Sequence, residues 1–501
     1  MPDRHSAVVS ADQSVAGIRV QPARVNPKLL RAYDLRGTVG TELKARDAFA
    51  LGCCYAARLA STGGRRVAVG YDGRLSSPML ENALVDGLVG GGAEVVRVGQ
   101  GPTGMLYYAV NELVLDGGIM VTGSHNPADQ NGFKLLLGRE PVYGAALAAL
   151  IGAKTAPPAD LEPSAPGETY EPEAIEGTAL GHDARRQRGR SDRVAVEDRY
   201  LDRLMQAAQG LPALRIGWDA GNGATGNIVT RLAARLPGEH HLINCTIDGR
   251  FPAHHPDPSV PENLVQLQAL VTTDQLDLGI AFDGDGDRIG VVDGTGRVVW
   301  ADQLLLLLAR DVLRDHPGAT IVADVKSSRI LIDGIAAAGG KALLSPSGYV
   351  LVRAAMLTAG APLAGEMSGH IFFADRWYGT DDAVHVALRV LGAIGRSGGG
   401  LADFRAALPP SFATPELRIA CPDEAKTGIL AAVFERLAAT GADVDRTDGL
   451  RVTTPAGWWL LRASGTEAKL TARVEAWSEA GLADLQAELF EHLAAAGLRR
   501  L

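Results

Sequence analysis

Three aspartates alternate with glycines in the segment FDGDGDRIG, where Asp283, Asp285 and Asp287 occupy positions i, i+2 and i+4. The preceding apolar run LGIAF predicts a strand that ends at this acidic loop. Glycine lets the backbone curl so that alternate carboxylates converge, and anions this close repel one another unless a hard cation lies between them. The segment therefore predicts a Mg²⁺ site with coordination positions left for a phosphate oxygen.

Two other interpretations of the acidic segment are a solvated turn and an EF-hand calcium loop. An EF-hand needs a longer ligand loop that ends in Glu and is flanked by helices. Here a strand precedes the loop and another strand-like run, IGVVDGTG, follows it. The pattern favours a metal loop between two strands.

A second polar loop, VTGSHNPADQNGFK, follows the apolar residues 119–121. It contains a hydroxyl at Ser124, an imidazole at His125 and an amine at Lys134. These groups suit a nucleophile exposed at the end of a strand, but most loop serines are caps or turn formers. The residues alone leave both interpretations open.

Three further loops contain groups that bind phosphates or sugars. RASGTEAKL combines an arginine that can grip phosphate bidentately with hydroxyls and a glycine, although Ser-Gly-Thr also forms ordinary turns. GEMSGH places a carboxylate and a hydroxyl two residues apart, which suits a pair of sugar hydroxyls. RAYDLRG adds two arginines, for which an ordinary ion pair is an equal alternative. The residues are Arg462, Ser464, Gly465, Thr466, Glu366, Ser368, His370, Arg31 and Arg36.

Composition describes a globular protein. The 501 residues are 46% hydrophobic and 21% charged, with a net charge of -9, so overall electrostatics does not favour a nucleic-acid partner. No run approaches the roughly 18 apolar residues of a membrane span, and the first 20 residues are polar, which predicts a cytoplasmic protein. The chain has four cysteines, of which Cys53 and Cys54 are adjacent and the other two lie far away in the sequence. This spacing fits a reducing compartment.

Apolar runs alternate with Ala- and Leu-rich helical stretches along most of the chain, and each run ends in a loop rich in Gly, Asp and Ser. This rhythm predicts an α/β fold in which three mixed-sheet domains are followed by a smaller C-terminal α+β domain. A Pro-, Ala- and Glu-rich segment predicts an insertion. The predicted boundaries are 1–20 (disordered tail), 21–155 (domain 1), 156–194 (insertion), 195–298 (domain 2), 299–410 (domain 3) and 411–501 (domain 4).

Taken together, the loops resemble those of the α-D-phosphohexomutases, most closely the bacterial phosphomannomutase/phosphoglucomutase branch. The motifs RAYDLRG, VTGSHNPADQNGFK, DGDGDR, DVKSS, GEMSGHIFFADRWYGTDD and RASGTE occur in family order across residues 31–467. The resemblance implies four domains around a central cleft. It also implies hexose phosphates as the partners, and a monomer or weak homodimer.

The resemblance assigns a role to each matching position. Ser124 matches the phosphorylated serine, which shares a Mg²⁺ ion with the three aspartates. Arg36, His125, Lys134, Arg288 and His370 match residues near the transferred phosphoryl group, with the proton carrier left open among them. Substrate-binding positions are Tyr33, Lys326, Tyr349, Glu366, Ser368, Arg462, Ser464, Gly465 and Thr466.

The implied reaction interconverts mannose 6-phosphate and mannose 1-phosphate, and the corresponding glucose phosphates, through a hexose 1,6-bisphosphate. Two departures concern the sugar: Tyr349 stands where family members commonly have His, and the SGTE core is similar to that of phosphoglucosamine mutases. Phosphoglucosamine mutase is therefore the enzymatic alternative. A non-catalytic sugar-phosphate sensor and a phosphatase with an Asp nucleophile are alternatives of other classes.

Overall fold

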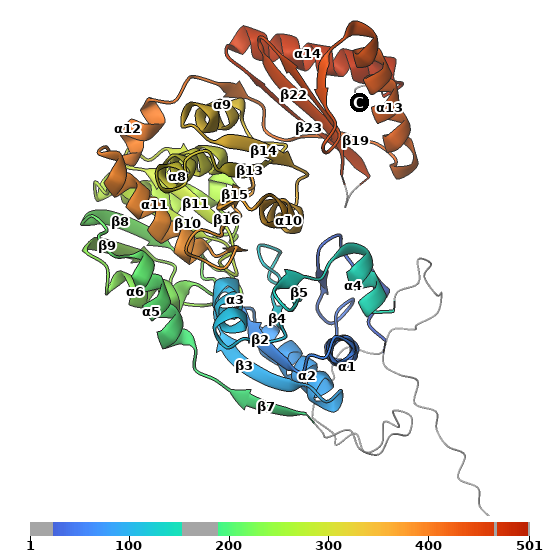
Figure 1. Cartoon of the computed structure of the whole chain (residues 1–501), viewed down its shortest axis with the longest axis vertical. Coiled ribbons are helices and arrows are strands. Elements are labelled where there is room, and N and C mark those ends of the chain that lie inside the picture. The colour runs from blue at the N-terminus through green and yellow to red at the C-terminus, as the bar shows by residue number, and fades with distance from the viewer. Residues whose placement is uncertain (1–23, 153–188, 465–467, 499–501) are drawn as a thin grey trace, which may run out of the picture.

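The computed structural model describes residues 24–152, 189–464 and 468–498. The predicted tail at 1–20, most of the predicted insertion, and Gly465 and Thr466 lie outside these ranges. The chain forms four sheets that follow one another along an arc, with the first and last at its two ends (Figure 1).

The first domain is a mixed sheet with the strand order β1-β5-β4-β2-β3-β7, and β6 pairs with β5. The strands β2, β3, β4 and β7 run parallel, whereas β5 is antiparallel to both of its main neighbours. Its elements are η1 (Pro27–Leu29), β1 (Leu35–Thr38), α1 (Ala45–Ser61), β2 (Arg66–Tyr71), α2 (Ser77–Gly90), β3 (Glu94–Gln100), α3 (Thr103–Glu112), β4 (Gly117–Val121), β5 (Gln130–Leu137), β6 (Glu140–Pro141), α4 (Gly144–Leu150) and β7 (Arg190–Arg193).

The second domain contains a five-stranded sheet with the order β12-β11-β10-β8-β9. Its elements are α5 (Glu197–Ala207), β8 (Leu214–Asp219), α6 (Gly226–Ala233), β9 (Gly238–Ile243), η2 (Pro261–Leu264), α7 (Val265–Thr273), β10 (Leu278–Phe282), β11 (Ile289–Asp293) and β12 (Val298–Val299).

The third domain contains a five-stranded sheet with the order β14-β13-β15-β16-β17. Its elements are α8 (Ala301–Asp315), β13 (Thr320–Asp324), α9 (Arg329–Ala337), β14 (Lys341–Ser345), α10 (Tyr349–Ala359), β15 (Leu363–Gly365), β16 (Ile371–Phe373), β17 (Thr380–Asp381), α11 (Ala383–Ser397) and α12 (Leu401–Ala406).

These three domains repeat one strand pattern, as the sequence rhythm predicted. A first strand pairs in parallel with a second and a third, and a fourth strand then returns antiparallel to the third. The third strands β4 and β10 are buried along their whole length, which explains their continuous apolar sequences. The turn between the third and fourth strands is the equivalent place in each domain where polar residues leave the sheet.

The fourth domain is smaller and its sheet is antiparallel, with the order β18-β23-β22-β21-β20 and with β19 also paired to β23. The segment LRVTTPAGWWLLRAS forms two strands of a hairpin. The elements are β18 (Phe412–Ala413), β19 (Leu417–Ala420), α13 (Asp423–Thr440), β20 (Asp443–Asp445), β21 (Leu450–Thr454), β22 (Gly457–Ala463), β23 (Lys469–Ala476) and α14 (Glu479–Ala495).

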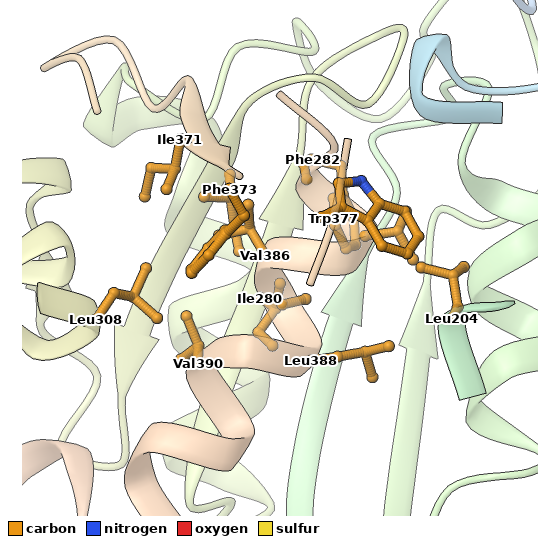
Figure 2. Close-up of a cluster of buried hydrophobic side chains, with 14 of the residues drawn as sticks. Leu204, Ile280, Phe282, Leu308, Ile371, Phe373, Trp377, Val386, Leu388 and Val390 are labelled. Carbon is orange, nitrogen blue, oxygen red and sulfur yellow. The ribbon is translucent and has the colours of Figure 1, made fainter. Parts of the chain in front are cut away.

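One apolar core extends from the first domain through the second and third. Figure 2 shows its centre, where side chains of β10, β16 and α11 pack together, among them Ile280, Phe373 and Val386. Helix α11 starts after Asp382, whose side chain accepts the N–H of His385 at 3.1 Å. This shared core fixes the third strands of the second and third domains relative to each other.

Strand β7 differs from the sequence interpretation, which placed these residues in the insertion. Its backbone pairs in parallel with β3 at the edge of the first sheet, although its four side chains are exposed. An edge strand needs only backbone hydrogen bonds on one side, so the polar sequence RSDR contains no apolar alternation that would have indicated it.

Within the three described ranges, none of the helices combines the length and apolar character that crossing a membrane would require.

The packing of α1 against α2 yields a prediction about stability. A Cβ atom on Gly87 of α2 would lie 2.1 Å from the carbonyl oxygen of Phe49 in α1, whereas one on Gly90 meets nothing within 4 Å. Gly87→Ala should therefore destabilise the protein by about 1–3 kcal/mol through overpacking, although alanine favours helix. Gly90→Ala, the matched control, should be neutral or stabilising by up to about 1 kcal/mol. Urea unfolding of both variants measures the difference, and equal effects would contradict the close contact.

Candidate active site

Ser124 lies in the turn after β4, where its backbone adopts a left-handed conformation with φ of 50°. Its Oγ is 3.0 Å from Oδ2 of Asp283 and 3.1 Å from Nδ1 of His125. Burial lowers the pKa of His125 well below its ordinary value, and the nearby cations Arg288 and Arg36 lower it further. A neutral imidazole and the metal loop of another domain thus meet at one hydroxyl.

Arg74, which the sequence analysis did not select, holds this serine loop in place. The guanidinium is buried and donates hydrogen bonds of 2.5–2.9 Å to the carbonyl oxygens of four loop residues, Ser124, Asn126, Pro127 and Gln130. Asp72 pairs with Arg74 at 3.2 Å and accepts the hydroxyl of Thr122 at 2.8 Å, which in turn accepts the N–H of Ser124. These bonds hold the residue in a conformation that non-glycine residues seldom adopt.

The three aspartates of the acidic loop converge as the sequence predicted. Oxygen atoms of Asp283, Asp285 and Asp287 lie within 4.8 Å of one another, and all three side chains are buried. Oδ1 of Asp285 and Oδ1 of Asp287 have no hydrogen-bond partner in the described part of the chain. Buried carboxylate oxygens without partners are costly, and hard divalent cations take oxygen ligands of this kind. The donor set therefore fits a divalent metal ion.

Burial and mutual repulsion raise the pKa of Asp283 well above its ordinary value. Burial would raise the pKa of Asp285 as well, but Lys134 and the hydroxyl of Thr103 hold it below the usual range. Nζ of Lys134, on β5, lies 2.7 Å from Oδ2 of Asp285 and also contacts Oδ2 of Asp287. Lys134 thus neutralises part of the acidic loop through the Oδ2 atoms, while the Oδ1 atoms of the same two carboxylates stay without partners among the described residues.

Arg36 also donates hydrogen bonds to the loop that contains Ser124. It pairs with Asp34 at 2.8 Å and donates to the carbonyl oxygen of Gly123 at 2.9 Å and to Oδ1 of Asn126 at 2.7 Å. Although burial opposes its charge, Asp34 and Asp285 raise the pKa of Arg36, so the guanidinium stays protonated.

His370 connects the acidic loop to the third domain. Its Nε2 accepts a hydrogen bond from Nε of Arg288 at 3.0 Å, and its Nδ1 donates to Oδ2 of Asp381 at 2.8 Å. Tyr349 stacks on the imidazole with ring centroids 5.3 Å apart. Asp381 was not selected from the sequence, because its role depends on the turn that places it beside the ring. The pair of bonds fixes both the tautomer and the orientation of the imidazole.

Three predicted sugar-binding residues lie on the third-domain loops. Glu366 is buried and its N–H closes the turn by donating to the carbonyl oxygen of His370 at 2.8 Å. Oγ of Ser368 has no hydrogen-bond partner among the described residues, so it remains available to a ligand. Lys326 lies 3.8 Å from Oδ2 of Asp324.

Arg462 reaches the same region from the fourth domain. Its Nε and Nη2 both lie 2.9 Å from Oδ2 of Asp448, which also accepts the N–H of Ser347 at 3.1 Å. The carbonyl oxygen of Ser347 accepts the hydroxyl of Tyr33 at 3.0 Å. Residues of the first, third and fourth domains are therefore joined in one chain of contacts. Ser464 borders the undescribed residues 465–467 and its N–H donates to the carbonyl oxygen of Lys469 at 3.0 Å.

A cavity of about 720 Å³ adjoins these residues, and Lys326, Ser368 and Arg462 line it together with residues of the second and fourth domains. The predicted residues thus form two groups. Ser124, His125, Lys134, the aspartates, Arg288 and His370 form a tight polar cluster, whereas Lys326, Ser368 and Arg462 line the cavity. Glu366 and Tyr33 lie in loops and Tyr349 is the first residue of α10; Tyr349 contacts both Tyr33 and His370.

Family models match four consecutive parts of the chain. All four are described as phosphoglucomutase/phosphomannomutase: alpha/beta/alpha domain I over residues 27–155, domain II over 198–296, domain III over 300–412 and the C-terminal domain over 416–492. Each match falls on one of the four sheets, and the edge strand β7 lies outside the matched ranges.

Individual relatives are similar over nearly their full lengths. A phosphomannomutase/phosphoglucomutase of Pseudomonas putida is 40% identical over 92% of this chain and 94% of its own. A phosphoglucomutase of Neisseria gonorrhoeae is 38% identical over 93% and 96%, respectively. The crystal structure of a phosphoglucomutase/phosphomannomutase family protein from Burkholderia thailandensis has a TM-score of 0.82 and 36% identity, and covers 94% of this chain and 98% of that one.

The acidic loop yields a prediction about metal binding. Asp285→Asn should weaken the binding of Mn²⁺, a probe for divalent sites, at least about tenfold, because it removes an anionic oxygen ligand. Asp248→Asn is the control and should bind as the wild type does, because among the described residues this carboxylate pairs with the side chain and the backbone N–H of Arg250. Electron paramagnetic resonance of free Mn²⁺ measures both affinities. Unchanged binding in Asp285→Asn would show that the acidic loop is not the metal site.

Proposed function

The chain belongs to the phosphoglucomutase/phosphomannomutase family, and we propose that Ser124 is the phosphoryl carrier through which it interconverts the 6- and 1-phosphates of mannose and of glucose. The activity of the family is reversible phosphoryl transfer within hexose phosphates. The observation that supports this assignment is the meeting of Ser124 Oγ with the acidic loop at 3.0 Å. Mg²⁺ is the proposed ion, since carboxylate oxygens and a phosphate oxygen suit its hard character.

In the first half of the proposed reaction, phosphoserine 124 transfers its phosphoryl group to a free hydroxyl of the bound hexose monophosphate. The bond from phosphorus to Oγ breaks while a bond from phosphorus to the sugar oxygen forms, and the hydroxyl proton passes to a group of the site. Arg36, Lys134 and Arg288 compensate the negative charge around the transferring group. A bound Mg²⁺ supplies further charge neutralisation at the phosphoryl oxygens when it is present.

The hexose 1,6-bisphosphate then turns by half a rotation, and its other phosphate returns a phosphoryl group to Oγ of Ser124. This second half requires that either phosphate can occupy the binding position opposite the serine. Arg462 offers a guanidinium for that position, with Ser464 and the adjoining residues Gly465 and Thr466 as further proposed contacts. Glu366 and Ser368 are proposed to bind sugar hydroxyls in both orientations. The proposed substrate contacts also include Lys326, Tyr33 and Tyr349.

The proton carrier is proposed to be Lys134, His370 or another group of the site. Asp285 and Asp287 raise the pKa of Lys134 well above its ordinary value in spite of burial, so its ammonium group suits the donation of a proton and not the uptake of the hydroxyl proton. His370 is oriented by Asp381 and Arg288 through its two nitrogens. A cytoplasmic location and a monomeric or weakly dimeric state remain predictions from the sequence.

The function is tested by measuring turnover of mannose, glucose and glucosamine 1-phosphates separately. The wild type should convert the mannose and glucose substrates with a kcat/KM at least about tenfold above that for glucosamine, and Ser124→Ala should lose roughly a thousandfold or more of this activity. Ser61→Ala, at the exposed end of α1, is the control and should be unaffected. Peptide mass spectrometry should locate a phosphoryl group on Ser124 and its loss on mixing with substrate.

Each alternative gives a different result in the same experiment. A preference for glucosamine 1-phosphate would indicate a phosphoglucosamine mutase. Release of inorganic phosphate that persists in Ser124→Ala would indicate a phosphatase, and binding without turnover would indicate a sensor.

Asp448 yields a second prediction about the proposed phosphate site. Asp448→Ala removes the partner that holds Nε and Nη2 of Arg462 and the acceptor of the Ser347 N–H. If Asp448 positions the guanidinium, the KM for the hexose phosphate should rise roughly tenfold while kcat changes less. Asp443→Ala, on the exposed edge strand β20, is the control. A lower KM would instead show that the carboxylate only repels the substrate phosphate.

A further inference from the structure

A second crevice, of about 630 Å³, lies between the second and third domains. One wall is the end of α5 and the segment leading to β8, and the other wall is α11. Its lining residues are Arg203, Gln206, Ala207, Gln209, Gly210, Leu211, Pro212, Arg376, His385, Leu388, Arg389, Gly392, Gly395 and Arg396. None of these residues belongs to the proposed catalytic or substrate-binding set.

Four arginines line this crevice, and no carboxylate does. Three of them have acidic partners behind the lining: Arg389 pairs with Asp375 at 2.9 Å, Arg396 pairs with Asp311, and Arg376 lies 3.1 Å from Asp315 and 3.6 Å from Asp375. The fourth, Arg203, has no ion pair with any described residue. The lining itself therefore carries four cations and no carboxylate, while a further carboxylate, Glu112, accepts the hydroxyl of Tyr378 at 2.6 Å beside Arg203.

Aromatic rings, rather than a carboxylate, hold Arg203 in place. Its guanidinium lies 4.6 Å from the ring centre of Trp377 and 5.5 Å from that of Tyr378. It donates to the hydroxyl of Tyr378 at 3.2 Å and to the carbonyl oxygen of Arg376 at 2.6 Å. A guanidinium has five N–H groups, so donors remain for an anion in the crevice. Trp377 belongs to the same apolar cluster as Leu204 and Leu388, which Figure 2 shows around it.

His385 lines the same crevice and carries a buried ring nitrogen to which no described residue donates a hydrogen bond. The side chain is 1% exposed, it stacks on Trp377 with ring centres 4.0 Å apart, and its Nδ1 has no hydrogen-bond partner among the described residues. Burial lowers the pKa of His385 well below its ordinary value, helped by Arg389 and Arg203, so the ring is neutral and donates one N–H.

The surface of α11 in the crevice is open because Gly392 has no side chain. A Cβ atom there would meet only Leu211 Cδ2 at 3.6 Å and Arg396 Nη2 at 4.0 Å, which are ordinary contact distances. The lining includes no member of the catalytic cluster, although His385 lies only three residues after Asp382, the N-cap of α11.

We infer that this crevice is a second anion site, which binds a small molecule through a phosphate group held by Arg203 and the neighbouring arginines. Arginine is the side chain best suited to planar, bidentate recognition of phosphate. The phosphate group itself is the recognised chemistry, whether it comes from free phosphate or from a sugar phosphate.

Equilibrium dialysis with inorganic phosphate tests this inference. In the Arg462→Gln background, which weakens the proposed catalytic phosphate position, about one phosphate should still bind per chain. Adding Gly392→Glu places a carboxylate in the crevice without moving Arg203, and should weaken this binding at least about tenfold. Gly392→Ala, the matched control, should retain it. Gly392→Glu and Gly392→Ala are also compared in the wild-type background. An error in the role proposed for Arg462 can then be told apart from an error in the proposed crevice site.

A second pair of variants addresses Arg203 itself. Arg203→Gln should weaken the remaining phosphate site at least about tenfold, whereas Arg199→Gln, which removes an exposed charge from the same helix, should not. Free phosphate and glucose 6-phosphate should bind with comparable affinity. Equal binding in Gly392→Glu and Gly392→Ala, or binding of the sugar phosphate without binding of free phosphate, would overturn the assignment.

Discussion

The burial of three carboxylates in one loop is the constraint on which the rest of the site depends. At separations below 4.8 Å, each pair of charges costs roughly 3–4 kcal/mol at an effective dielectric constant of about 20. The loop itself offers only the N–H groups of Asp287 and Arg288, which both donate to Asp283. The remaining compensation has to come from other parts of the chain. Lys134 supplies it from the first domain, and the two unpartnered oxygens leave a place for a divalent cation.

The repeated strand pattern explains how groups from separate domains reach this loop. Ser124, the acidic loop and the segment from Glu366 to His370 all occupy the turn between the third and fourth strands of their domains. Each of these turns begins at the end of a fully buried third strand, so the core fixes the position of its backbone. The shared core of the second and third domains then holds two of these turns together, and the bridge between Arg288 and His370 joins them directly.

The sequence predicted the parts of this arrangement that are local. The alternation of strands and loops predicted the α/β class and the repeat. The metal site was predictable because its three aspartates lie close together in the sequence. Arg74, Asp381 and Asp448 were not found, because each is a single charged residue whose partners lie far away in sequence or in another turn. Arg74 acts on a loop 50 residues further on, and Asp448 links Arg462 to Ser347. Only the folded chain shows such pairings, and the same holds for β7, whose exposed side chains contain no pattern.

Tyr349, a position where the sequence resemblance implied a His, contacts three of the proposed site residues. Its ring stacks on His370, meets Tyr33 edge-on with ring centres 6.0 Å apart, and lies 5.8 Å from Nζ of Lys134. Burial raises the pKa of Tyr349, so its hydroxyl stays neutral and can donate a hydrogen bond. An imidazole at this position could accept a proton near neutral pH, which a phenol cannot. The two candidate proton carriers, Lys134 and His370, both lie against the Tyr349 ring, so Tyr349 offers them an uncharged contact surface.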